Sequence, residues 1–353
     1  MADALVYRAE GAAVASGADL YGFTVTRWQL PATYPPFAAM LFVPLSWLPV
    51  PGLKVAFLAG NAVLLAVFVR LSCRFAGVTV RTEAVLAVTA VALWLEPVFQ
   101  TLVFGQINLV VACLVLWDLA RPSGARGKGI ALGVAAGIKL TPAVFILFLL
   151  LTGRVRAAMG ALAAFAGTVV LGGLLLPSAS FDFWTRRIFE TGRVGKAWIV
   201  DNQSLQGLVA RVLHDPEPGL AWVVLAVLAG GAGLWAARRV PYRWGVLVTA
   251  VTALLVSPIS WSHHWVWCVP LIAVLVGSGR VRVAWVMAGV FAARTMWVVP
   301  HQGDLDLQLP WWQQVLAAPY PLVGLVLVGC AVEYARRRGV STRTEAVVRV
   351  PVV

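Results

Sequence analysis

The sequence predicts an all-α membrane protein with many spanning helices, and three observations support this fold class. Hydrophobic residues make up 60% of the 353 residues, and charged residues only 12%. The mean hydropathy is +0.85, which soluble domains rarely reach. Apolar stretches long enough to cross a bilayer, about 17–25 residues, recur along the chain.

Nine apolar segments are predicted as spans. They lie near residues 53–70, 84–103, 107–120, 157–177, 219–237, 244–258, 264–278, 283–299 and 319–335. A tenth segment, 129–152, differs because Lys139 and Pro142 interrupt its middle and basic clusters flank both of its ends. We expect two half-helices that enter the membrane and return to the same face, with their irregular centre against protein or a watery cavity.

The distribution of charge predicts the orientation. The chain carries 28 Lys and Arg against 15 Asp and Glu, a net charge of +13. Most of the basic residues lie in the segments 70–83, 121–128, 153–156, 238–243, 279–282 and 336–353. Because cytoplasmic loops are enriched in Lys and Arg, these segments are predicted to be cytoplasmic, including the basic tail 336–353. The regions 1–52 and 178–218 then face outward and are expected to contribute to the active site.

The excess of positive charge suits basic loops against an anionic leaflet. No RNA-binding motif or basic stripe with interleaved aromatic residues is present, so membrane lipids are the expected partners and nucleic acid is not. No linker divides the chain, which predicts one membrane domain over residues 1–353. The chain would start on the outer face without a preceding span, so we expect that a first span is missing from its N-terminus.

Two ionisable residues inside predicted spans are candidates for function, because a charge in the membrane is costly. Lys139 lies at the break of the re-entrant segment. Its ammonium group could bind a lipid phosphate, or the side chain could extend to the cytoplasmic face. Arg294, near the outer end of its span, could bind phosphate or pair with a nearby acid.

The motif SPISWSHHWVW, residues 257–267, lies at an outward turn. Adjacent histidines point to different faces of a helix, and the better spacing for a metal, His-x-x-x-His, is absent. The four cysteines form no Cys-x-x-Cys pair, so no metal site is predicted. His263 or His264 could donate a hydrogen bond to a phosphate or a sugar hydroxyl, or both could form a polar interfacial pair.

The first outward segment supplies two candidate bases, Asp3 and Glu10. One carboxylate suffices to take a proton from a sugar hydroxyl when the donor already carries a good leaving group such as phosphate. The paired carboxyl groups of a glycoside hydrolase are then unnecessary.

Several motifs occur in a characteristic order. They are DALVYRAEG followed by DLY, then YPPFAAMLFVPLSWLP, GQINLVVACLVLWDLA, GIALGVAAGIKLTPAVFILFLLL, NQSLQGLVARVL and SPISWSHHWVWCVPL. Together they cover nearly the whole chain and thin out beyond about residue 270. In their order and spacing they resemble glycosyltransferase family 87, the polyprenol-phosphate-mannose-dependent α-(1→2)-mannosyltransferases of actinobacteria.

The resemblance implies a GT-C-type bundle in the bacterial plasma membrane, with an active site that faces outward. Its expected reaction moves mannose from a β-linked polyprenyl phosphate to a hydroxyl of a glycolipid or glycan acceptor, with inversion. No further cofactor and no divalent metal are expected.

The resemblance also implies a role for Asp3, and our first hypothesis combines it with the residues singled out above. The base would be Asp3, and the phosphate contacts would be Lys139 and Arg294. One of His263 and His264 would orient the donor. The remaining candidates for substrate binding are Tyr34, Asn202 and Gln203.

Alternatives remain at this stage. A broken helix with a charge at mid-depth also marks transport sites, so a transporter or flippase for a lipid-linked sugar is the main rival. A family member that uses another polyprenyl-phosphate sugar is a second, and a catalytically inactive scaffold is a third. A transporter would be expected to have two related halves, and no second copy of the Lys139 break is found.

Overall fold

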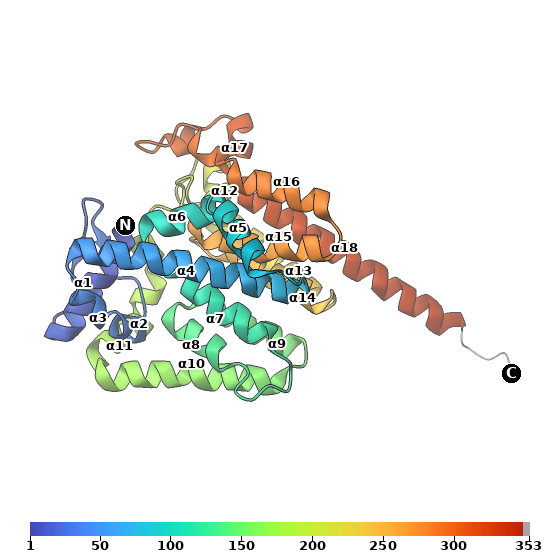
Figure 1. Ribbon diagram of the computed structural model, residues 1–353. Helices are drawn as coiled ribbons and strands as arrows, with labels where there is room; N and C mark the ends of the chain where they lie inside the picture. The colour runs from blue at the N-terminus through green and yellow to red at the C-terminus, as the bar shows by residue number, and fades with distance from the viewer. Residues whose placement is uncertain (349–353) are drawn as a thin grey trace.

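The structure, a computed structural model, describes residues 1–348, with side chains through Arg338. The chain is mostly helical (Figure 1). In the first half the helices are α1 Ala2–Ser16, α2 Pro36–Leu41, α3 Val43–Ser46, α4 Val50–Ala76, α5 Thr82–Ala92, α6 Glu96–Phe104, α7 Asn108–Ala120, α8 Ile130–Ile138, α9 Val144–Leu151 and α10 Val155–Leu175. In the second half they are α11 Pro177–Thr185, α12 Leu205–Leu213, α13 Gly219–Ala237, α14 Tyr242–Val256, α15 Cys268–Gly277, α16 Val281–Ala292, α17 Trp311–Ala317 and α18 Pro319–Val348.

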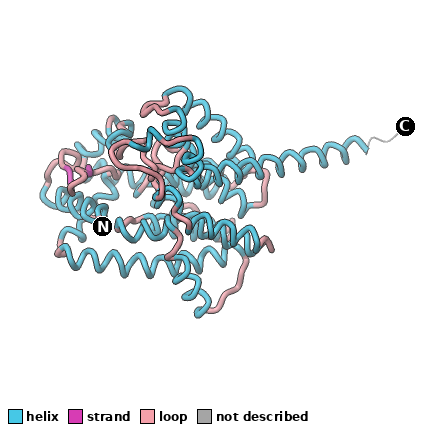
Figure 2. Tube along the Cα trace, turned by 90° about the horizontal axis from the view of Figure 1, so that it is seen from above, coloured by secondary structure: helices cyan, strands magenta, loops and turns pink. Residues whose placement is uncertain are grey.

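Short elements complete the described part of the chain. Strands β1 Thr24–Val25 and β2 Leu30–Pro31 form an antiparallel ribbon, visible in magenta in Figure 2. Six 3₁₀ turns are η1 Thr141–Ala143, η2 Arg187–Phe189, η3 Thr191–Arg193, η4 Ser262–Trp267, η5 Thr295–Trp297 and η6 Leu305–Gln308. Residues 349–353 of the predicted basic tail lie outside the described residues.

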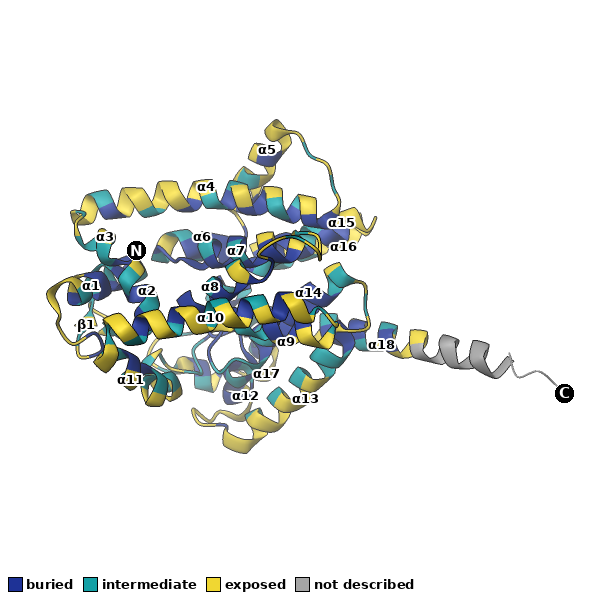
Figure 3. Ribbon diagram, turned by 90° about the horizontal axis from the view of Figure 1, so that it is seen from below, coloured by how far each residue is buried: buried dark blue, intermediate teal, exposed yellow. Residues whose placement is uncertain are grey.

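Several helices are long and apolar enough to cross a membrane. Three single helices qualify, α4, α10 and α13, and the bent pairs α5–α6 and α17–α18 raise the number to at most five. Their outer faces expose apolar side chains such as Val55 of α4, Leu174 of α10 and Val227 of α13 (Figure 3). Apolar surface on this scale is typical of lipid-facing helices. The protein is therefore embedded in a membrane.

Several predicted spans differ from the observed helices. The segments 107–120, 244–258 and 264–278 correspond to helical stretches of fewer than 18 residues, and two other segments are broken. The segment 84–103 is bent by 80° between α5 and α6, because α6 starts afresh at Glu96–Pro97 and proline favours the first turn of a helix. The segment 283–299 leaves its helix after Ala292, since Arg294 adopts a left-handed backbone conformation with φ 53°. Neither is a straight helix of the predicted length.

The segment 129–152 forms two short helices, α8 and α9, that lie beside α10 (Figure 1). Lys139 between them has extended backbone, and Pro142 follows in η1, where it cannot donate to a continuing helix. The segment starts where Gly129 meets Ala157 and ends just before α10 begins. Both of its ends therefore lie at the N-terminal end of α10, in agreement with the predicted half-helices.

Glycines let α8 approach α10 closely. A Cβ atom on Gly129 would lie 2.0 Å from the Ala157 carbonyl oxygen, and one on Gly133 would lie 2.1 Å from that of Ala161. These glycines pack helix against helix, as small residues do in membranes. The start of the re-entrant segment is thus fixed to a long neighbouring helix, and so is the position of Lys139 at the end of α8.

At the end of the molecule that contains α1, short elements form a cap. The proline-bounded stretch 32–49 makes the short helices α2 and α3. The loop before α12 is bound to the loop before η4: Gln203 N donates to the Ser260 carbonyl at 2.8 Å, and Ser260 N donates to Asn202 Oδ1 at 2.9 Å. Ser204, the residue just before α12, caps this helix: its side-chain oxygen accepts a hydrogen bond from Gly207 N.

Candidate functional site

A cavity of about 620 Å³ opens between the cap and the helices. Its wall combines the start of α1, the ribbon, the turn after α6, the break after α8 and the loops around residues 194–201 and 261–264. Five residues predicted as site residues line it, although they are far apart in sequence: Asp3, Tyr34, Lys139, His263 and His264.

The carboxylate of Asp3 is held by one neighbour. Gln106 donates from Nε2 to Asp3 Oδ2 at 2.7 Å. Burial raises the pKa of Asp3 to about 6, while the Gln106 hydrogen bond and the charge of Lys139 lower it. Asp3 is therefore ionised at neutral pH and available to accept a proton.

Glu10, the other predicted base, lies elsewhere. It is fully buried, accepts a bond from Thr33 N at 3.3 Å and does not line the cavity. Burial raises the pKa of Glu10 to about 8, so its carboxyl group is mostly protonated at neutral pH. Of the two candidates, Asp3 alone faces the cavity in its ionised form.

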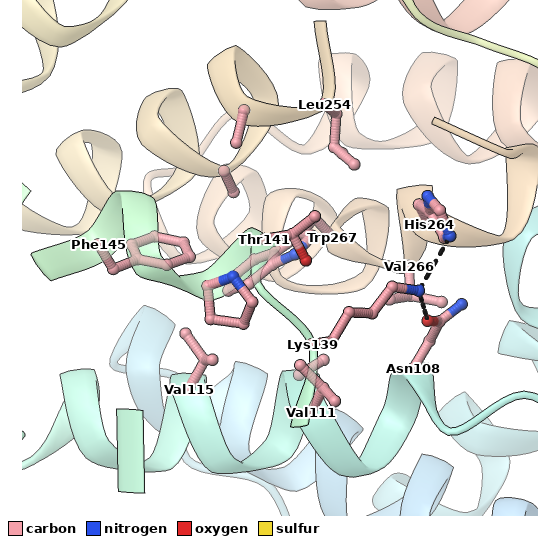
Figure 4. Close-up of a pocket in the computed structure, with 14 residues that line it drawn as sticks. Asn108, Val111, Val115, Lys139, Thr141, Phe145, Leu254, His264, Val266 and Trp267 are labelled. Atoms are coloured by element: carbon pink, nitrogen blue, oxygen red, sulfur yellow. Dashed lines mark hydrogen bonds between the residues drawn. The ribbon is translucent and has the colours of Figure 1, made fainter. Parts of the chain in front are cut away.

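Lys139 presents its ammonium group between two polar partners (Figure 4). Nζ donates to Asn108 Oδ1 at 3.0 Å and lies 3.0 Å from His264 Nε2. The same Nζ lies 5.6 Å from the centroid of the Tyr34 ring. A cation at the break of a buried helix pair can bind an anionic group that enters the cavity.

A second, narrower cavity adjoins the first at Lys139 and His264, which line both. Its remaining wall is mainly apolar and includes Val111, Val115 and Phe145 (Figure 4). The two cavities therefore meet at the ammonium group.

His263 is an unusual member of the wall. Only 3% of it is exposed, and neither of its ring nitrogens contacts a polar partner among the described residues. Its backbone carbonyl accepts from Asn108 Nδ2 at 2.9 Å. The unpaired ring can therefore serve a ligand in the cavity, since a buried polar group without a partner is costly.

Three other predicted residues lie outside the cavity wall. The guanidinium of Arg294 stacks over the Phe99 ring at 4.0 Å. Asn202 and Gln203 are fully buried, and their side-chain amides bond to backbone groups of the cap. These two amides shape the loop that carries Asp201.

Sequence reasoning missed three residues of the site: Gln106, Asn108 and Asp201. Asp201 lines the cavity and accepts from Ser262 N at 3.1 Å, and burial raises its pKa. Gln106 and Asn108 lie in the quoted motif GQINLVV, where two polar side chains at the start of an apolar helix could have marked them.

Among residues 1–348, no group of three or more His, Cys, Asp and Glu side chains could hold a metal ion. The charged side chains in the cavity wall are instead those of Asp3, Asp201, Lys139 and Lys196, and the Lys196 ammonium group is paired with Asp304 at 2.6 Å. Such a chamber can bind an anion at one point and accept a proton at another.

Comparison with known proteins identifies the family. A sequence profile of glycosyltransferase family 87 matches residues 32–258. The chain is 35% identical over 352 residues to the polyprenol-phosphate-mannose-dependent alpha-(1-2)-phosphatidylinositol mannoside mannosyltransferase of Mycobacterium tuberculosis, covering 92% of this chain and 82% of that protein. The protein of the same name in Mycolicibacterium smegmatis is 33% identical over 353 residues, covering 89% and 80%.

The pentamannoside mannosyltransferase of M. smegmatis, which is also described as polyprenol-phosphate-mannose-dependent, is 36% identical over 330 residues, covering 88% of this chain and 78% of the relative. No solved structure matches the chain significantly. The profile match and these identities, which extend over most of both sequences, lead to one conclusion: the chain belongs to glycosyltransferase family 87.

Proposed function

We propose that the protein transfers mannose from a polyprenyl-phosphate-mannose donor to a hydroxyl of a phosphatidylinositol mannoside, forming an α-(1→2) linkage. The names of the relatives support the donor, the linkage and the acceptor class. The single observation that carries the proposal for this chain is the cavity, where the ionised carboxylate of Asp3 and the cation of Lys139 face one space. The rival function, transport of a lipid-linked sugar, is not favoured for a member of a glycosyltransferase family.

The proposed reaction is a single displacement with inversion. An acceptor hydroxyl forms a bond to C1 of the mannose while the bond from C1 to the phosphate oxygen breaks, and the electron pair of that bond leaves with the phosphate. The hydroxyl proton passes to Asp3. The Gln106 hydrogen bond falls on Oδ2, which leaves Oδ1 free to take the proton.

Lys139 is proposed to bind the departing phosphate. Negative charge grows on the leaving oxygen in the transition state, and a prepositioned cation in a partly dry site stabilises that charge. His264 touches the same ammonium group and is proposed to share the phosphate. His263 and Tyr34, also on the wall, are proposed to orient the sugar.

The second, narrower cavity beside Lys139 is proposed to bind the first isoprene units of the donor. This cavity shares Lys139 and His264 with the first, and its wall includes the apolar side chains of Val111, Val115 and Phe145. A lipid phosphate at Lys139 would therefore place its chain against apolar side chains and its sugar toward Asp3.

We also propose a GT-C-type topology with about nine spans and the re-entrant pair α8–α9. In this topology the regions 1–52 and 178–218, and with them the cavity, face the outer side of the bacterial plasma membrane. Labelling of single cysteines in intact cells tests the orientation. Cysteine in place of exposed Asp215 should react with an impermeant maleimide, and cysteine in place of exposed Arg238 should not; the reverse pattern would refute the topology.

The function is tested by transfer of labelled mannose from synthetic polyprenyl-phosphate-mannose to phosphatidylinositol mannoside in proteoliposomes. The wild type should transfer mannose, and Asp3→Asn should not. Asp215→Asn is the matched control, because Asp215 lies on the exposed surface after α12. Absence of transfer by a correctly inserted wild type would refute the proposed function. Transfer only from a donor with another sugar would correct the donor assignment.

A further inference from the structure

We propose that Gln106 is a positioning residue for the proton acceptor. Its side-chain amide, held by the hydroxyls of Tyr7 and Tyr34, keeps the Asp3 side chain ionised and oriented toward the cavity. The proposal rests on the proposed function of the cavity. No property of the family is needed for it, because it follows from four contacts around a single amide.

The amide uses both of its ends. Nε2 donates to Asp3 Oδ2 at 2.7 Å. Oε1 accepts from the Tyr7 hydroxyl at 2.8 Å and from the Tyr34 hydroxyl at 3.3 Å. The two hydroxyls lie 3.0 Å from each other. All three side chains are at least nine-tenths buried, so water competes weakly with these bonds.

The carboxylate and the tyrosines together set which end of the amide faces Asp3. A glutamine side chain can rotate by 180°, which exchanges its oxygen and its NH₂ group. In this site a rotated amide would place its oxygen against the Asp3 carboxylate, which can only accept, and would lose the hydrogen bonds that Oε1 now accepts from the two hydroxyls. Tyr7 is itself fixed, because its ring stacks on Phe42 with centroids 4.7 Å apart.

The backbone holds the amide in place as well. Gln106 follows Gly105, which ends α6 in the left-handed conformation at φ 69°, and Gln106 N donates to the Thr101 carbonyl at 2.9 Å. A Cβ atom on Gly105 would lie 2.8 Å from Cβ of Ala4. The glycine thus allows α1, which carries Asp3, to lie directly on the turn that carries Gln106.

The charged groups that act on Asp3 come from several elements. Lys139 from the break after α8 lowers its pKa, and Asp201 from the cap raises it. Gln106 carries no charge but makes the direct hydrogen bond, and a hydrogen bond to the charged form favours that form. Loss of this bond therefore raises the pKa of Asp3, and the acidic limb of the activity profile moves to higher pH.

The test is the pH dependence of kcat/KM for mannose transfer by Gln106→Leu, Gln106→Glu and Tyr7→Phe. Leucine removes the donor, and we expect the midpoint of the acidic limb to move to higher pH by about one unit. A shift of about one unit corresponds to the free energy of a modest hydrogen bond to a charged group. Glutamate is nearly isosteric and still accepts from both tyrosines, but it places a second acid beside Asp3. Its limb should rise further than that of leucine. Tyr7→Phe, which loosens the amide orientation, should give the smallest rise.

A purely structural role predicts the opposite order, because glutamate preserves the shape and the tyrosine bonds. Activity that recovers as the pH is raised would separate a shifted base from a misfolded protein. Asp215→Asn is the control, since Asp215 lies on the exposed surface after α12, and its acidic limb should stay at the wild-type pH. Unshifted limbs in all three Gln106 and Tyr7 variants would overturn the inference.

The outcome is separable from failure of the proposed function. If the wild type transfers mannose and Asp3→Asn does not, the base assignment stands whatever Gln106 does. If the wild type transfers no mannose, the proposed function fails before the role of Gln106 is tested.

Discussion

The charged groups of Asp3 and Lys139 are each held by a side-chain amide. One amide donates a hydrogen bond to the acidic group, and the other accepts one from the basic group. At the acidic end, the Gln106 amide donates to the Asp3 carboxylate. At the basic end, the Asn108 amide accepts from the Lys139 ammonium group. What differs is the second partner: tyrosine hydroxyls face the oxygen of Gln106, whereas the carbonyl of His263 faces the NH₂ group of Asn108. An amide can serve either charge, and the neighbour behind it decides which.

The largest effect should come from removing the acid itself. Asp3→Asn keeps the shape and the contact with Gln106 but cannot accept a proton at neutral pH. Loss of a general base costs about 10²–10⁴-fold in rate, so mannose transfer should fall by about that factor in the reconstituted assay. Asp3→Asn with near wild-type kcat would move the base to Asp201, the other carboxylate on the wall.

Removing the cation should have the next largest effect. Lys139→Met keeps much of the side-chain volume but stabilises no charge on the leaving phosphate, and we expect a loss of about 10²–10³-fold in kcat. Lys139→Arg retains the charge and serves as the matched control, with a smaller loss. Equal losses in both variants, measured by single-turnover transfer, would indicate that the role of Lys139 depends on shape and not on charge.

The pH profile distinguishes the two ends without mutation. Asp3 has a pKa of about 6, raised by burial, and it acts in the deprotonated form. Activity should therefore rise as the pH increases through about 6, and kcat/KM reports this group in the free enzyme. A profile that instead falls across this range would require an acid where we place a base.

Asn108→Leu tests whether the amides differ as the comparison says. The change removes the acceptor for Lys139 and the donor to the His263 carbonyl, so activity should fall about tenfold through misplacement of the cation. The acidic limb should move less than that of Gln106→Leu, because Asn108 does not touch Asp3 and acts on its pKa only through the position of Lys139. If the limb moved as far as that of Gln106→Leu, the contact to Lys139 would affect the pKa of Asp3 as strongly as the direct hydrogen bond from Gln106 does.

The smallest effect is expected from Asp201→Asn. The negative charge of Asp201 raises the pKa of Asp3, so its removal should lower the acidic limb by a fraction of a pH unit. That direction is opposite to the one expected for Gln106→Leu. Measurement of kcat and KM at pH 5.5 and pH 7.5 would detect it as a gain at low pH relative to the wild type.

The sequence predicted the membrane class and the broken segment at Lys139 because both follow from local patterns, namely apolar length and an interrupting charge and proline. It also predicted five of the residues that meet in the cavity. It did not reveal that Asn202 and Gln203 lie behind the wall, because their direction depends on backbone partners such as Ser260 and Ala317 that are distant in sequence. Gln106 was missed for the same reason, since its importance lies in contacts to Asp3 and Tyr7.

The turn after α6 has a consequence for how the site could change its substrate. Gln106 and Asn108 are two residues apart, so their Cα atoms can be separated by roughly 7 Å at most. The turn therefore limits the distance between the two amides that contact the proton acceptor and the cation. Room for a different sugar must come from the opposite wall, where Gly195 lies against the Trp261 ring and the ribbon residue Leu30 faces the same space. Differences in sugar specificity between related proteins should therefore be concentrated in the ribbon and in the loops that carry Gly195 and Trp261. The turn after α6 should stay constant.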